Sequence, residues 1–152
     1  MVMTVRRSKI IFVLLCFANA VFGQLQIKTD TILCFGRKMV IEYPLKSRVN
    51  IVNYEEGYFK TINCITDTTV ITIHCGSMVN LPLTSMTNKT LCSEFILGKD
   101  IRSIRGYSIL NGGKKYFRED NYFKYGITVV YENVEERKLM YYEHFFNNIR
   151  IQ

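Results

Sequence analysis

Short runs of β-branched and aromatic residues, each ended by turn-forming residues, recur along the chain, and this pattern constrains the fold most strongly. Residues 31–35, 39–43 and 48–54 have the length and composition of strands. An apolar stripe with the 3.6-residue period of a helix is hard to find. We therefore expect a mostly β fold, a small antiparallel sheet or sandwich built from hairpins.

The segments 58–64 and 70–75 are expected to pair as one of these hairpins. A tight turn centred on Asp67-Thr68 would place Cys64 opposite Ile71. Side chains alternate along a strand, so the second segment should present two different faces. Val70, Thr72 and His74 would lie on one face, and Ile71, Ile73 and Cys75 on the other.

A second hairpin is expected around Asn111-Gly112-Gly113, which separates the runs 101–110 and 114–117. An Asn-Gly turn between apolar runs is a strong hairpin signal. The two glycines and the following Lys114-Lys115 could also contact phosphate, but a hairpin turn explains the same residues more simply.

The C-terminal segment has two interpretations. Residues 125–131 and 138–146 flank a charged stretch, 132–137, which suggests a final long hairpin with a charged tip. The alternative is a helix from about Glu135, because Glu-Glu-Arg-Lys-Leu-Met has helix propensity. The aromatic content of 141–146 leads us to favour the strand.

The first 23 residues have the three parts of a signal peptide. Arg6, Arg7 and Lys9 precede the apolar run 10–18, and small residues allow cleavage after Ala20 or Gly23. The alternative is a membrane anchor, but the run is shorter than the roughly 20 apolar residues that span a bilayer. We therefore expect residues 24–152 to form a single secreted, extracellular β-rich domain.

Removal of the signal peptide makes the chain only mildly basic. The full chain carries 20 basic and 13 acidic residues, and cleavage leaves 17 basic against 13 acidic residues, a net charge of +4. The basic residues form no block longer than two, whereas nucleic-acid-binding proteins usually concentrate them on one face. The charge permits an anionic partner without arguing for one.

Four cysteines remain after cleavage: Cys34, Cys64, Cys75 and Cys92. An even number in an exported chain favours two disulfides over free buried thiols. A zinc site is disfavoured because no close Cys-x-x-Cys pair occurs. Of the three pairings, we favour Cys34–Cys64 with Cys75–Cys92, because the expected hairpin register separates Cys64 from Cys75.

One glycosylation sequon, Asn88-Lys89-Thr90, lies in the polar loop 81–91 of the secreted part. A sequon is modified when it is exposed and follows the secretory route. We therefore expect an N-linked glycan on Asn88.

The residues that usually carry catalysis form no recognisable motif. The chain has two histidines, His74 and His144, and nothing in their spacing predicts that their side chains lie close together in the fold. The acidic pairs at 55–56 and 135–136 have the positions of solvated turns. Residues 118–121 are expected to form a polar loop, which lacks the ligand pattern of a calcium loop, so a divalent cation there is disfavoured. We expect no catalytic residue, metal site or cofactor. An enzyme built on a metal held by both histidines and loop carboxylates is the weakest alternative.

Three stretches resemble the N-terminal region of secreted, animal-type DNA/RNA non-specific endonucleases. They are the strand 69–77 closing on Cys75, the cysteine loop ending at Thr90-Leu91-Cys92, and the run 126–132 followed by 139–144. In that family a catalytic core follows and carries an Asp-Arg-Gly-His motif, whose histidine activates water beside a magnesium ion.

This sequence contains no Asp-Arg-Gly-His, so the resemblance transfers no catalytic residue. It implies a non-catalytic, truncated or degenerate relative that retains weak contact with nucleic acid or with a full-length nuclease. The alternative is an unrelated small secreted module that is held by disulfides and binds another protein.

Overall fold

The computed structural model describes residues 26–77, 83–84, 88–97 and 100–152. The expected signal peptide, residues 1–23, lies outside this part of the chain. Within the described ranges, no helix combines the length and apolar character needed to cross a membrane.

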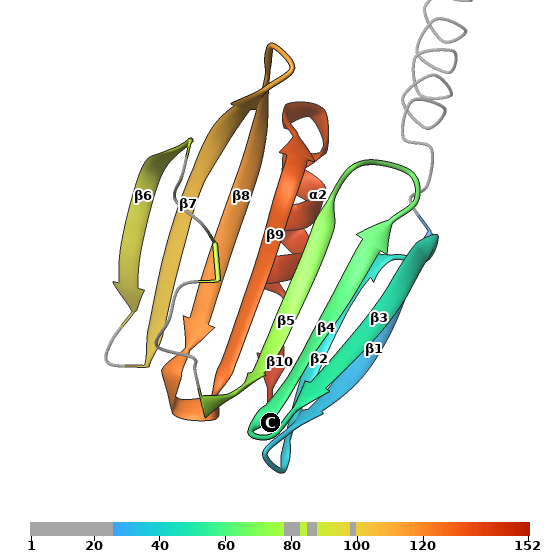
Figure 1. Ribbon diagram of the computed structural model, residues 1–152, viewed down its shortest axis with the longest axis vertical. Coiled ribbons are helices and arrows are strands. Elements are labelled where there is room, and N and C mark those ends of the chain that lie inside the picture. The colour runs from blue at the N-terminus through green and yellow to red at the C-terminus, as the bar shows by residue number, and fades with distance from the viewer. Residues whose placement is uncertain (1–25, 78–82, 85–87, 98–99) are drawn as a thin grey trace, which may run out of the picture.

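Antiparallel strands form two sheets in the described part of the chain (Figure 1). The larger has seven strands in the order β3-β4-β5-β9-β8-β7-β6, and the smaller has three in the order β1-β2-β10. The strands are β1 (Ile27–Cys34), β2 (Arg37–Pro44), β3 (Ser47–Tyr54), β4 (Gly57–Cys64), β5 (Val70–Gly76), β6 (Lys89–Leu97), β7 (Ile101–Leu110), β8 (Gly113–Tyr122), β9 (Ile127–Glu135) and β10 (Arg150–Ile151). The helical elements are η2 (Phe123–Tyr125), η3 (Glu136–Lys138) and α2 (Leu139–Asn147). The mostly β, antiparallel prediction is confirmed.

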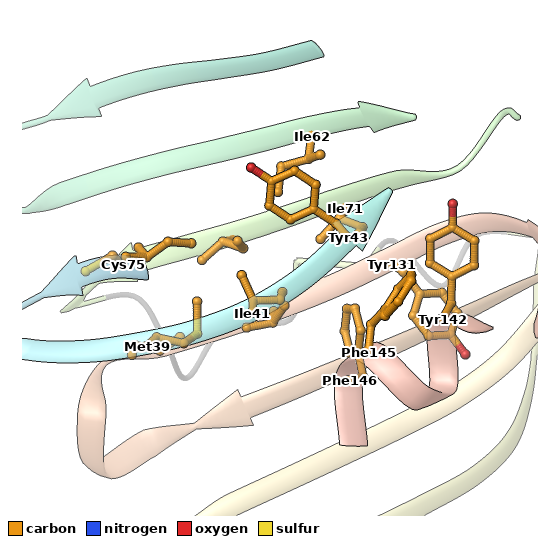
Figure 2. Close-up of a cluster of buried hydrophobic side chains, with 14 of the residues drawn as sticks. Met39, Ile41, Tyr43, Ile62, Ile71, Cys75, Tyr131, Tyr142, Phe145 and Phe146 are labelled. Atoms are coloured by element: carbon orange, nitrogen blue, oxygen red, sulfur yellow. The ribbon is translucent and has the colours of Figure 1, made fainter. Parts of the chain in front are cut away.

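The smaller sheet and α2 form a second layer behind the larger sheet (Figure 1). They cover the half of that sheet around β4, β5 and β9, whereas β6 and β7 extend beyond them. Ile71 and Ile73 of β5 are fully buried between the layers, as their expected face requires. In Figure 2, Met39, Ile41 and Tyr43 of β2 point into this core from the second layer.

The β4–β5 hairpin forms, but with a register two residues away from the predicted one. Ile62, not Cys64, lies opposite Ile71. The Asp67 carboxylate explains the shift, because it accepts a hydrogen bond from the Thr69 N–H at 2.8 Å and pairs with Lys138 Nζ at 2.8 Å. Asp67 is thereby held inside a four-residue loop and does not sit at the centre of a two-residue turn.

The β7–β8 hairpin turns at the predicted residues. Asn111 and Gly112 have φ values of 51° and 76°. Two successive positive φ values match the twist of the flanking strands, which is why Asn-Gly is favoured here. This prediction is confirmed.

The prediction of a final hairpin with a second strand at 138–146 is wrong, and the alternative prediction of a C-terminal helix is correct. Residues 139–147 form α2 after the short η3 turn. Tyr142, Phe145 and Phe146 are buried, and their i, i+3, i+4 spacing places them on one face of a helix. These aromatic side chains surround Tyr131 in Figure 2, so their composition reflects core packing and not a strand.

The favoured disulfide pairing is also wrong. Cys34 of β1 is bonded to Cys75 of β5, with their Cα atoms 5.7 Å apart. Both cysteines face the core, where the two sheets meet. Cys64 is a buried free thiol and Cys92 an exposed one, so the four described cysteines form one disulfide instead of two.

Candidate binding groove beside helix α2

The polar segment 118–121 was expected to be a loop, but it forms the middle of β8. Arg118, Glu119, Asp120 and Asn121 are 6%, 0%, 2% and 2% exposed. Alternation along the strand sends Arg118 and Asp120 towards α2 and the other two away from it. The two carboxylates therefore lie on opposite faces of the sheet.

On the face away from α2, Glu119 is held by hydrogen-bond donors. It accepts bonds from the Leu83 N–H at 3.1 Å, the Thr84 N–H at 2.7 Å and Asn121 Nδ2 at 2.9 Å. Asn121 also donates to Thr128 Oγ1 at 3.1 Å. A buried carboxylate with this many donors fastens residues 83–84 to the sheet.

On the α2 face, Arg118 is the centre of a buried ion network. Its Nε lies 3.0 Å from both Asp120 oxygens, and its Nη1 donates to Glu143 Oε2 and to Asn147 Oδ1, each at 2.8 Å. The guanidinium also lies 5.5 Å from the ring centroid of Phe146. Burial alone would lower the pKa of Arg118, but Asp120 and Glu143 raise it above its ordinary value. Arg118 is therefore a permanent buried cation.

Glu143 of α2 joins this network to a second arginine. Its Oε2 lies 3.2 Å from Arg105 Nη1, and its Oε1 accepts a hydrogen bond from the Tyr131 hydroxyl at 2.5 Å. Burial and the contact with Glu143 raise the pKa of Tyr131 well above its ordinary value, so the phenol stays protonated. Arg105 is a third exposed, unlike Arg118, and its side chain faces a groove.

The groove consists of two cavities that share Arg105 and Asn147. One, of about 500 Å³, is lined by Ser103 and Tyr122 and by the buried Arg118–Asp120 pair. The other, of about 470 Å³, is lined by Tyr131 of β9, by residues of α2 that include Met140, and by Ser93 and Tyr116. Cavities of this size fit ordinary small ligands. Arg105 lies where the two meet.

The same sheet face carries two tyrosines and a lysine, and one of the tyrosines, Tyr116, also lines the groove. Tyr107 lies opposite Tyr116 across β7 and β8, with ring centroids 6.2 Å apart. Lys114 Nζ lies 4.6 Å from the centre of the Tyr107 ring. We call Arg105, Tyr107, Lys114 and Tyr116 the β7–β8 binding face. The sequence carried a signal for it, because alternation along 101–110 puts Arg105 and Tyr107 on one side.

The two histidines do not meet. His74 is fully buried on the face of β5 away from the core, stacked on Phe59 at 4.6 Å between ring centroids and hydrogen-bonded to Tyr54 at 2.6 Å. His144 is an exposed residue of α2 and contacts Asn148. Over the described ranges, no cluster of three or more His, Cys, Asp or Glu side chains is placed to hold a metal ion.

Burial lowers the pKa of His74, which makes stability depend on pH. The unfolded chain takes up a proton at its histidines near pH 6.5, whereas folded His74 resists protonation. The free energy of unfolding should therefore be highest above about pH 7 and fall as the pH drops through about 6. Urea unfolding of H74F, which keeps an aromatic ring in the stack, should lack this loss. H144Q should keep it, and an equal loss in H74F would contradict the assignment.

The remaining predicted residues lie at the surface. Asn88 is exposed, with a φ of 60°, at the turn before β6, and its glycosylation stays a prediction. Glu55 and Glu56 are exposed at the β3–β4 turn. Glu135 pairs with Lys115 and Arg137, which lower its pKa. None of these residues contributes to the groove.

Comparison with known proteins gives no relative for this groove. No protein-family model, curated protein or solved structure matches the chain. The resemblance to the endonucleases therefore rests on the sequence stretches alone and stays a prediction.

Proposed function

We propose that residues 24–152 are a secreted, non-catalytic domain that binds single-stranded nucleic acid on the β7–β8 binding face and along the groove beside α2. The observation that carries the proposal is the position of Arg105. Its partly exposed guanidinium lies between two cavities and in line with a tyrosine pair and Lys114. Cationic and aromatic groups thus alternate along one open sheet face.

Single-stranded nucleic acid matches this arrangement because it offers both groups that such a face can bind. Phosphates pair with Arg105 and Lys114, while bases stack on the rings of Tyr107 and Tyr116. Both tyrosines are partly exposed, so part of each side chain is within reach of a ligand. Sheets that display aromatic side chains in this way bind unpaired bases, which a duplex hides in its stack.

The groove is better suited to binding than to acid–base chemistry. Its two carboxylates, Asp120 and Glu143, are each engaged by Arg118, and Glu143 is engaged by Arg105 and Tyr131 as well. A carboxylate whose oxygens already accept these donors has little capacity left to take a proton from a ligand. We therefore expect the groove to bind its ligand without cleaving it.

The test is the fluorescence anisotropy of a labelled oligo(dT) of about 12 nucleotides. Replacing Tyr116 with alanine removes a stacking surface worth about 1–3 kcal/mol, so binding should weaken at least about fivefold. K114Q should weaken binding and make it less dependent on salt, because one phosphate contact is lost.

The matched control is K124Q, which removes the same charge from an exposed lysine that also contacts a tyrosine ring, that of Tyr125. It should bind as the unmodified protein does. Equal losses in K114Q and K124Q, or no binding at low salt, would overturn the binding site. Cleavage of plasmid DNA in the presence of magnesium would overturn the non-catalytic part.

A further inference from the structure

The edge strand β3 lies at the opposite end of the large sheet from the binding face. Each of its residues from Arg48 to Asn53 is exposed, and Val49, Ile51 and Val52 are 43%, 53% and 54% exposed. Only β4 pairs with it among the described strands, so its outer backbone groups face away from the sheet. A long apolar edge of this kind is a template for another strand, and natural proteins normally protect it with charge, proline or a bulge.

The charges at the two ends of β3 show which strand would fit. Lys46 and Arg48 make its beginning basic, and Glu55 and Glu56 make its end acidic. All four side chains are exposed. A second β3 that runs antiparallel would bring the basic end of each copy against the acidic end of the other.

We propose that two copies of this chain associate edge to edge through β3, in antiparallel orientation, to form one continuous sheet. A two-fold axis perpendicular to the sheet keeps each side chain on the same face of the sheet in both copies. Residues directly opposite each other across the interface must share a face, so their residue numbers must both be odd or both be even. The pairing with Ile51 opposite its symmetry mate brings Lys46, in the bend before β3, next to Glu56, in the turn that follows β3 of the other copy. The neighbouring register, centred on Asn50, places Lys46 opposite Tyr54 and loses the charge pairs.

This interface joins apolar contact to charge complementarity. Cross-strand partners lie about 4.5–5.5 Å apart, which brings the two Ile51 side chains together at the centre. Backbone hydrogen bonds supply affinity along the strand, as in other cases of strand addition. The isologous arrangement closes after two copies, because pairing uses the free edge of each β3.

The experiment is analytical ultracentrifugation of the secreted protein over a hundredfold concentration range, in a C92S background. That substitution prevents dimers linked through the exposed Cys92 thiol. I51E should weaken dimerisation at least about tenfold, because two carboxylates would face each other. Within the monomer the new glutamate lies opposite Lys60, so β3 should still pair with β4. The control I96E changes an isoleucine that is 70% exposed on the other edge strand, and should leave the dimer intact.

Charge reversal gives a second, independent test. K46E and E56K should each weaken the dimer, and the double variant should restore it, because the pair is then present with inverted signs. A protein that is monomeric throughout the range would overturn the proposal. So would a dimer that is insensitive to I51E, or one that the double variant fails to restore.

Discussion

Replacing Arg118 with methionine is expected to lower the free energy of unfolding by about 3–5 kcal/mol. The substitution keeps an apolar chain of similar length but removes the cation that Asp120 and Glu143 share. Asp120 is 2% exposed, so its charge would stay buried without the guanidinium that pairs with it. Leaving a buried charge without its partner costs far more than the intact pair contributes.

The matched control is R102M. Arg102 on the same hairpin pairs with Glu94, but the two side chains are 31% and 39% exposed. A pair in solvent contributes about 0–1 kcal/mol, so this loss should be small. Urea unfolding of both variants measures the difference. Equal midpoints for R118M and R102M would contradict the buried network.

The predictions that succeeded depend on local chemistry. Asn111-Gly112 specifies its turn through the φ values that these two residues adopt readily. Alternation along β5 predicts that Ile71 and Ile73 share a face, and the structure shows that this face lies in the core. Such features need no knowledge of the rest of the chain.

The aromatic composition of the α2 segment predicts a strand, whereas the spacing of its buried residues is that of a helix. Tyr141 to Phe146 is rich in aromatic residues, which favour strands when they pack on a sheet. The buried members, Tyr142, Phe145 and Phe146, instead follow a helical spacing. Packing against Tyr131 favours the helix over a strand, and this contact cannot be predicted from the local sequence.

The groove could not be derived because it depends on burial of polar residues. Four consecutive polar residues normally indicate a loop, yet 118–121 forms a central strand whose partners are supplied by α2, β7, β9 and residues 83–84. No local pattern shows that Glu143 lies beside Arg105 and Arg118, which precede it by 38 and 25 residues. The groove forms only because the fold brings together strands and a helix that are distant in the sequence.

The disulfide pairing likewise could not be predicted from the local sequence, because it depends on how distant strands pack. Removing this disulfide should cause the second large loss of stability. We expect the C34S/C75S double variant to lose about 4 kcal/mol of stability, because the bond closes a loop between residues 41 positions apart and restricts the unfolded chain. C92S removes an exposed free thiol and should leave stability unchanged. Thermal unfolding of both variants without reductant measures the difference.

A peptide map without reductant checks the pairing on which this prediction depends. One peptide pair should join Cys34 to Cys75, and Cys64 should react with a thiol reagent only after unfolding, because its side chain is buried. Burial also raises the pKa of Cys64, which keeps it a thiol and slows its oxidation. A peptide joining Cys34 to Cys64 would contradict the core geometry, because Cys75, the partner of Cys34, lies opposite Tyr58 near the start of β4, whereas Cys64 is the last residue of that strand.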